Sequence, residues 1–267
     1  MNRAWLLPGL LLAQYALVWV RVCLPHPFWG DAWWPEALLL LLAVAGVLAA
    51  QARQVPGQNV ALASIIILSL AGLALAAGAR AGIPLGPITG PGRSGNEDLR
   101  WLPWAAAFWL LALLTSRGVA RLILRPCRAS FTYGFQVLGL TVLLAVLFNL
   151  ASQPFASCAG HSWPRQVGAP PSGGPPSSLA SCVGLGAQAV TALFILVLAT
   201  PSLIDKRRAS PPPDSYPLAI WALANLLFTT AAIARHAWSA AVLASLSALV
   251  VTLLGMRGAA AAEVQSA

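Results

Sequence analysis

The chain has 267 residues, of which 58% are hydrophobic and 9% are charged. Soluble globular domains carry about 25% charged residues, so this composition excludes a protein whose whole surface faces water. The formal net charge is +9, but the basic residues occur in short segments between long apolar stretches. That pattern is typical of membrane-protein loops. It argues against a nucleic-acid partner and for the lipid bilayer.

Eight apolar stretches, each close to the length of about 20 residues that a bilayer-spanning helix needs, follow one another along the chain. They are rich in Leu, Ala and Val and lack the alternation of a barrel strand, so we predict helices. The predicted spans are approximately 4–24, 35–52, 60–79, 101–116, 131–152, 183–204, 216–235 and 237–256. The sequence thus predicts an all-α bundle in which 1–267 form a single transmembrane domain, with no separate soluble domain.

Two of these stretches raise a question of their own. The first follows Met1-Asn2-Arg3 as a signal peptide would, but it lacks an Ala-x-Ala cleavage pattern, so we interpret it as a span. The stretch 101–116 is the shortest and stops at Arg117. If it did not cross, every later loop would change sides.

The distribution of basic residues predicts the orientation. With eight spans, one side of the membrane receives ten basic residues and the other receives six. Cytoplasmic loops carry the excess of Lys and Arg, so we expect both termini in the cytoplasm, at a plasma or inner membrane. The ten residues are Arg3, Arg53, Arg117, Arg121, Arg125, Arg128, Lys206, Arg207, Arg208 and Arg257.

Two of the four cysteines bracket one predicted outer loop. Cys158 and Cys182 flank residues 159–181, whereas Cys23 ends the first span and Cys127 lies on the cytoplasmic side. Disulfides persist in oxidising compartments, so we predict a Cys158–Cys182 disulfide that ties this Pro-rich loop to spans five and six. If the thiols are free instead, Cys182 lies at a helix start, where a thiol pKa is lowered.

All three histidines fall in predicted outer segments. His26, His161 and His236 lack the paired spacing of a metal site such as His-x-x-x-His. We interpret them as solvated loop residues. The alternative is an outer metal or acid–base site.

The predicted span interiors carry neutral polar residues in place of charges. We expect these to form interhelical hydrogen bonds or to line a substrate path; they are Gln136, Asn149, Gln188 and Asn225. No P-loop, zinc-protease, nucleophile-elbow, dinucleotide or c-type haem motif occurs, so no cofactor is expected. The sequence favours a permease-like carrier of a neutral or lipidic substrate, or a structural subunit assembled with other membrane subunits.

The alternative is an outer-face membrane enzyme acting on lipid-linked or peptide substrates. Its candidate groups are Cys182 as nucleophile, His236 as base and Arg235 as anion anchor. Over these few residues, beginning Cys182-Val183-Gly184-Leu185, the chain resembles exosortases, which are multi-span cysteine transpeptidases. The resemblance implies a transpeptidase activity. It departs from that family's pattern where Val183 replaces the usual serine and where Arg235 and His236 are adjacent.

Overall fold

The computed structural model describes residues 6–24, 34–82, 84–85, 88–89, 101–128, 130–158, 165–166, 178–203 and 214–266, without the side chains of 88–89, 157–158, 165–166, 178–182 and 262–266. Within these residues, eight helices account for all eight predicted spans and confirm the all-α bundle. They are α1 (Leu6–Cys23), α2 (Trp34–Ala52), α3 (Gly57–Ala81), α4 (Leu102–Ile123), α5 (Tyr133–Cys158), α6 (Ser178–Ala199), α7 (Tyr216–Ala234) and α8 (Trp238–Ser266).

Among the described residues, four short elements lie between the helices. The single-turn 3₁₀ helix η3 (Arg125–Cys127) follows α4, and η5 (Thr200–Leu203) continues α6. The strands β1 (Ile88–Thr89) and β2 (Arg165–Gln166) pair antiparallel, with Ile88 opposite Gln166. This ladder joins the segment after α3 to the segment after α5.

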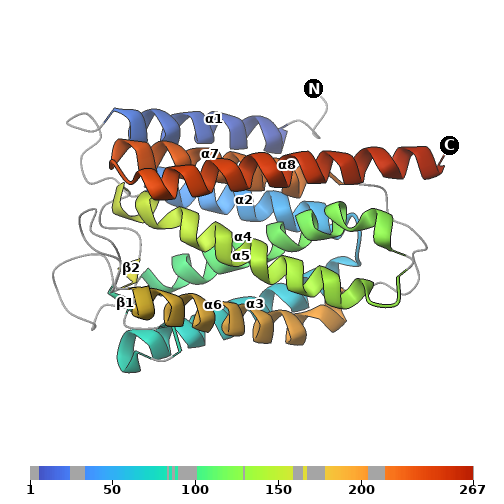
Figure 1. The fold of residues 1–267 in the computed structure, drawn as a ribbon, viewed down its shortest axis with the longest axis horizontal. Coiled ribbons are helices and arrows are strands. Elements are labelled where there is room, and N and C mark those ends of the chain that lie inside the picture. The colour runs from blue at the N-terminus through green and yellow to red at the C-terminus, as the bar shows by residue number, and fades with distance from the viewer. Residues whose placement is uncertain are drawn as a thin grey trace.

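The helices form three groups that run along one axis (Figure 1). Helices α1, α7 and α8 lie along one side, α3 and α6 lie along the opposite side, and α2, α4 and α5 lie between them. Helix α1 begins and α8 ends at the same end of the bundle (Figure 1). We call this the basic end, because α4 ends here with Arg121 and η3 follows with Arg125.

Helix α4 is the centre of the bundle. It packs against α2, α3, α5, α7 and α8, and most of its residues are buried. It is also the least apolar of the eight spans. A helix that faces protein on all sides does not have to be soluble in lipid, which explains why sequence alone made this span look marginal.

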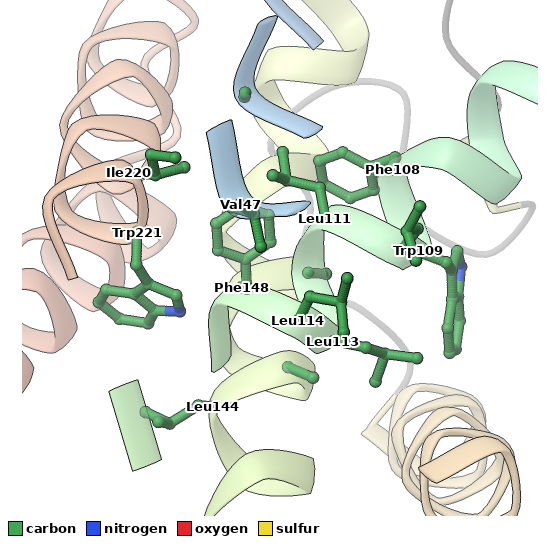
Figure 2. Close-up of a cluster of buried hydrophobic side chains, with 14 of the residues drawn as sticks. Val47, Phe108, Trp109, Leu111, Leu113, Leu114, Leu144, Phe148, Ile220 and Trp221 are labelled. Carbon is green, nitrogen blue, oxygen red and sulfur yellow. The ribbon is translucent and has the colours of Figure 1, made fainter. Parts of the chain in front are cut away.

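The bundle core is aromatic where α4, α5 and α7 meet (Figure 2). The ring centroids of Phe148 and Phe228 are 5.2 Å apart, and Phe108 lies 5.4 Å from Phe148. Trp221 on α7 is fully buried beside Phe148. Tilted and edge-on ring pairs at these distances contribute about 0.5–1.5 kcal/mol beyond the burial of their area.

The outer helices expose large apolar side chains. Ile65 and Leu73 on α3, Phe194 on α6 and Leu249 on α8 are each more than half exposed. Soluble monomers rarely expose contiguous apolar surface on this scale. The apolar side chains suit a hydrocarbon solvent, in agreement with the length and composition of the helices.

Candidate functional site

A cavity of about 340 Å³ opens at the basic end between α4, α5 and α6. We call it the arginine cavity, because three arginines contribute to its wall. Its described lining is Gln54, Val55, Arg117, Arg121, Arg128, Tyr133, Gly134, Val137, Leu138, Thr141, Leu196, Thr200 and Leu203. The lining combines a basic, hydrogen-bonding part with an apolar part.

Arg117 is the buried cation of this cavity. Only 7% of the residue is exposed. Its Nη1 donates to Thr200 Oγ1 at 3.1 Å, and its Nη2 donates to the carbonyl oxygen of Leu203 at 3.3 Å. The buried Nε has no hydrogen-bond partner among the described residues. Both acceptors are neutral, so this guanidinium is held in place without a counter-charge from them.

Arg121 and Arg128 continue the basic wall toward the surface. Arg121 lies four residues after Arg117 on α4, so the two side chains project from the same face of the helix. Arg121 is half-buried, and its Nη1 donates to Gln54 Oε1 at 3.0 Å. Arg128 follows η3 and is exposed. The burial of the three guanidinium groups therefore increases from Arg128 at the mouth through Arg121 to Arg117 in the interior, and we call them the graded series.

The apolar wall of the cavity consists of Val55 after α2, Val137 and Leu138 on α5, Leu196 on α6 and Leu203 in η5. Thr141 adds a hydroxyl group, but its Oγ1 already donates to the carbonyl oxygen of Val137 at 2.6 Å. A ligand that fits this cavity therefore needs an anionic group and an apolar part.

The described lining of the cavity contains no carboxylate. Among the carboxylates whose side chains the structure describes, Asp214 lies 3.7 Å from Nη1 of Arg53, and Glu36 pairs with Arg21 on other helices. The described lining also contains no cysteine or histidine. The described lining thus offers binding groups for an anion, and its hydroxyl groups are those of Tyr133, Thr141 and Thr200.

Sequence reasoning placed Arg117 and Arg121 in a cytoplasmic loop, because a charge after an apolar run was interpreted as the end of a span. Helix α4 instead continues to Ile123 and ends just before Arg125-Pro126. Two features of the sequence could have indicated that the helix continues past Arg117. The two arginines are spaced four residues apart, and Pro126 is the first strong helix breaker after them. Nothing in the sequence indicated Thr200 as a partner, 83 residues further along the chain.

The four predicted lining residues lie elsewhere, and none lines the arginine cavity. Gln136 is exposed and donates to Thr132 Oγ1 at 3.2 Å. Asn149 and Gln188 are buried on α5 and α6. Asn225 is fully buried and donates to the carbonyl oxygen of Trp221 at 2.9 Å. Their role in a substrate path stays a prediction.

The candidates for an outer-face enzyme come from different parts of the bundle. Arg235 and His236 form the exposed turn between α7 and α8, and His236 has a positive φ of 56°. Cys182 belongs to α6, which packs mainly on α3 and α5 on the opposite side of the bundle (Figure 1). His26 and His161 lie outside the described residues.

The predicted disulfide joins two helices that pack against each other. Helix α5 ends at Cys158, and α6 begins at Ser178, four residues before Cys182. The side chains of both cysteines lie outside the described part of the structure. The other two cysteines, Cys23 and Cys127, are exposed free thiols. The pairing of Cys158 with Cys182 remains a prediction.

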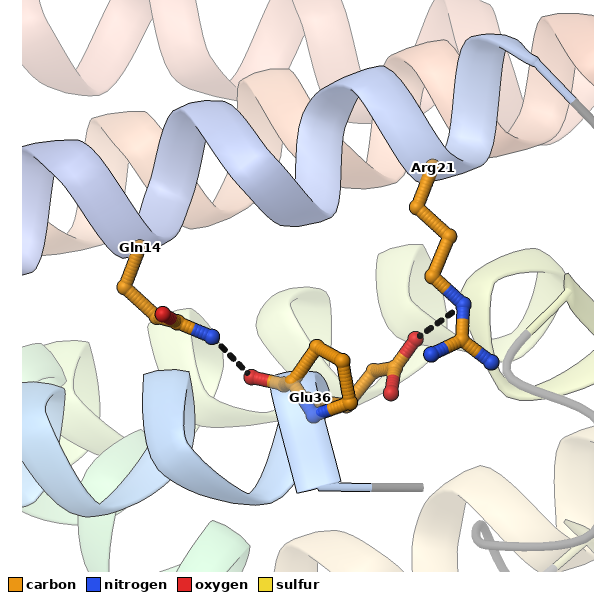
Figure 3. Close-up of polar contacts among 4 residues, drawn as sticks. Gln14, Arg21 and Glu36 are labelled. Carbon is orange, nitrogen blue, oxygen red and sulfur yellow. Dashed lines mark hydrogen bonds and ion pairs between the residues drawn. The ribbon is translucent and has the colours of Figure 1, made fainter. Parts of the chain in front are cut away.

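An ion pair that sequence reasoning missed joins α1 to α2 (Figure 3). Arg21 Nε lies 3.3 Å from Glu36 Oε1, and the Glu36 side chain is only 4% exposed. About two turns earlier on α1, Gln14 Nε2 donates to the carbonyl oxygen of Pro35 at 2.8 Å. These contacts hold α1, which is the least buried of the eight spans, against its neighbour.

Comparison with protein families, with curated proteins and with solved structures finds no match to this chain. The fold itself defines the class. Eight helices that are long and apolar enough to cross a membrane make this a polytopic membrane protein.

Proposed function

We propose that this protein is a permease-like membrane protein that binds an amphiphilic anion in the arginine cavity. The observation that carries the proposal is Arg117, a buried guanidinium held by two neutral acceptors in a cavity whose described lining contains no carboxylate. Buried charges in membrane proteins are costly and mark substrate or ion pathways. An anionic ligand supplies the counter-charge.

The polarity of the cavity defines the class of ligand. The sequence favours a neutral or lipidic substrate because the predicted span interiors carry no charge, but α4 contains the buried Arg117. The guanidinium groups now favour a phosphate or carboxylate, which arginine binds with paired hydrogen bonds. The wall of Val137, Leu138 and Leu196 favours an attached apolar group. The substrate that we propose is therefore lipidic, as the sequence predicts, but anionic instead of neutral.

Binding is tested with hexyl phosphate and its neutral analogue hexanol on the purified protein. A ligand that binds only the folded state raises the unfolding temperature, so hexyl phosphate should raise it and hexanol should not. The Arg117→Gln variant should bind hexyl phosphate about tenfold more weakly, because it loses a charge-assisted hydrogen bond. Arg257→Gln is the matched control, since Arg257 is exposed on α8 and does not line the cavity.

Transport is tested separately in proteoliposomes loaded with hexyl phosphate. We expect protein-dependent exchange that Arg117→Gln reduces and Arg257→Gln preserves. Equal stabilisation by hexanol, or unchanged binding in Arg117→Gln, would overturn the anion site. Binding without exchange would overturn the carrier part of the proposal.

A further inference from the structure

We infer that the natural ligand of the arginine cavity is a membrane lipid whose headgroup ends in a phosphate monoester. The inference rests on the proposed function and names the substrate class of the same site. Three observations carry it: the position of the mouth, the apolar wall and the number of guanidinium groups.

The mouth of the cavity lies beside exposed aromatic side chains. Arg128 and Gly134 are exposed members of the lining and therefore mark its mouth. Tyr133 lines the cavity beside Gly134 at the start of α5, and the neighbouring Phe131 and Phe135 are 99% and 76% exposed. Aromatic residues next to basic ones are typical of the membrane interface, where rings meet headgroups. The position of Arg128 and Tyr133 at helix ends places the mouth at headgroup level. A ligand that already lies in the membrane therefore meets the mouth directly.

The apolar wall extends from the mouth into the bundle. Leu138 is partly exposed on α5, and Leu196 is buried on α6. The same helices expose Leu143, Val190 and Phe194. A lipid can place its headgroup among the arginines while its chains stay against these outward-facing side chains. A small water-soluble anion has no apolar group that could contact this surface.

The guanidinium groups of Arg117 and Arg121, whose acceptors Thr200, Leu203 and Gln54 are all neutral, match a doubly charged headgroup. A phosphate monoester carries between −1.5 and −2 charges at pH 7, with a second pKa of about 6, whereas a phosphodiester carries −1. Basic pockets between transmembrane helices are known binding sites for anionic lipid headgroups. The graded series of Arg128, Arg121 and Arg117 leads such a headgroup from the surface to the buried position.

The experiment measures lipids retained by the full-length protein in nanodiscs. The discs contain phosphatidylcholine with equal small fractions of phosphatidate, a monoester, and phosphatidylglycerol, a diester. We expect enrichment of phosphatidate over phosphatidylglycerol at pH 7.5. The enrichment should decrease by pH 5.5, because the monoester loses its second charge below about pH 6. The titrating group is the ligand, since the described lining offers only Arg117, Arg121, Arg128 and Tyr133 as charged or ionisable side chains.

A steric variant tests the route without altering a charge. Gly134 lines the mouth, and a Cβ added there meets no atom within 4 Å. Gly134→Leu should therefore fold normally and reduce phosphatidate retention about tenfold by narrowing the mouth. Gly139→Leu is the matched control, because Gly139 lies on the same helix, has the same open surroundings and does not line the cavity.

The outcomes separate this inference from the proposed function. Phosphatidate enrichment that Gly134→Leu and Arg121→Gln reduce and Gly139→Leu preserves supports the inference. Equal retention of phosphatidate and phosphatidylglycerol overturns it. Binding of hexyl phosphate without phosphatidate enrichment overturns the inference and leaves the proposed function standing. If neither ligand binds, both are overturned.

Discussion

At the scale of single residues, Arg117 combines a structural and a binding role that mutation can separate. Its guanidinium joins α4 to η5 through Thr200 and Leu203. A buried charge costs free energy, and replacing buried ionic groups with apolar side chains of similar size is often neutral or stabilising. Binding sites commonly retain such unfavourable groups at the expense of stability.

We therefore expect Arg117→Met to lower the free energy of unfolding by no more than about 1 kcal/mol while weakening hexyl phosphate binding about tenfold or more. Reversible unfolding in mixed micelles, with and without the ligand, measures both quantities. A large loss of stability in the absence of ligand would show that Arg117 is mainly a link between helices.

In contrast to the loss of Arg117, the loss of one charge from the ion pair of Arg21 and Glu36 is expected to destabilise the protein strongly. Glu36 is 4% exposed on its side-chain surface, so its removal leaves Arg21 without its counter-charge. We expect Glu36→Gln to lower the free energy of unfolding by about 3 kcal/mol, as for other broken buried pairs. The double variant Arg21→Met, Glu36→Met should recover most of that loss. A double variant as unstable as the single one would mean that the pair itself is not what holds α1.

At the scale of helices, close backbone contacts fix how α8 and α7 cross the central helix. A Cβ added to Gly258 on α8 would overlap the carbonyl oxygen of Leu122 on α4. A Cβ added to Gly118 on α4 would lie 2.6 Å from Cβ of Pro217 on α7. Small residues permit this closeness between membrane helices.

We expect Gly258→Ala to lower the free energy of unfolding by about 1–3 kcal/mol, the usual range for overpacking, because a backbone atom cannot move aside as a flexible side chain can. The Gly139→Ala variant meets no neighbouring atom and should leave stability unchanged or slightly higher. The same unfolding assay compares the two. Equal stability in both variants would contradict the close contact of α8 with α4.

The helices also show which features of the fold could be predicted from the sequence. Apolar length predicted all eight spans, because insertion into lipid depends on local composition. It did not predict that α4 continues past Arg117, because the burial of that charge depends on α6 and η5, which come much later in the chain. For the same reason, the arginine cavity was missed, while neutral residues such as Gln136 were proposed as a lining.

At the scale of the whole molecule, the central question is which end of the bundle faces the cytoplasm. The structure places the start of α1 and the end of α8 at one end (Figure 1), together with η3 and the arginine cavity. The excess of basic residues predicts that this end is cytoplasmic. In that orientation the cavity faces the leaflet richest in anionic lipid.

The free cysteines provide a direct test of this orientation. Cys23 ends α1 and Cys127 ends η3, at opposite ends of the bundle, and both are exposed. In intact cells, a membrane-impermeant maleimide should label a variant with Cys23 alone and should label a variant with Cys127 alone only after permeabilisation. The reverse pattern would invert the topology. In a variant with only Cys158 and Cys182, labelling that requires prior reduction would support the predicted disulfide.

The most direct test of the account is to locate an anion in the arginine cavity. Tungstate is an oxyanion that scatters strongly enough to be placed by anomalous diffraction from crystals of the full-length protein. We expect a tungstate peak within hydrogen-bond distance of the guanidinium groups of Arg117 and Arg121, and we expect Arg117→Gln to remove it. Tungstate bound only to exposed arginines such as Arg257, with none beside Arg117, would contradict the proposed site.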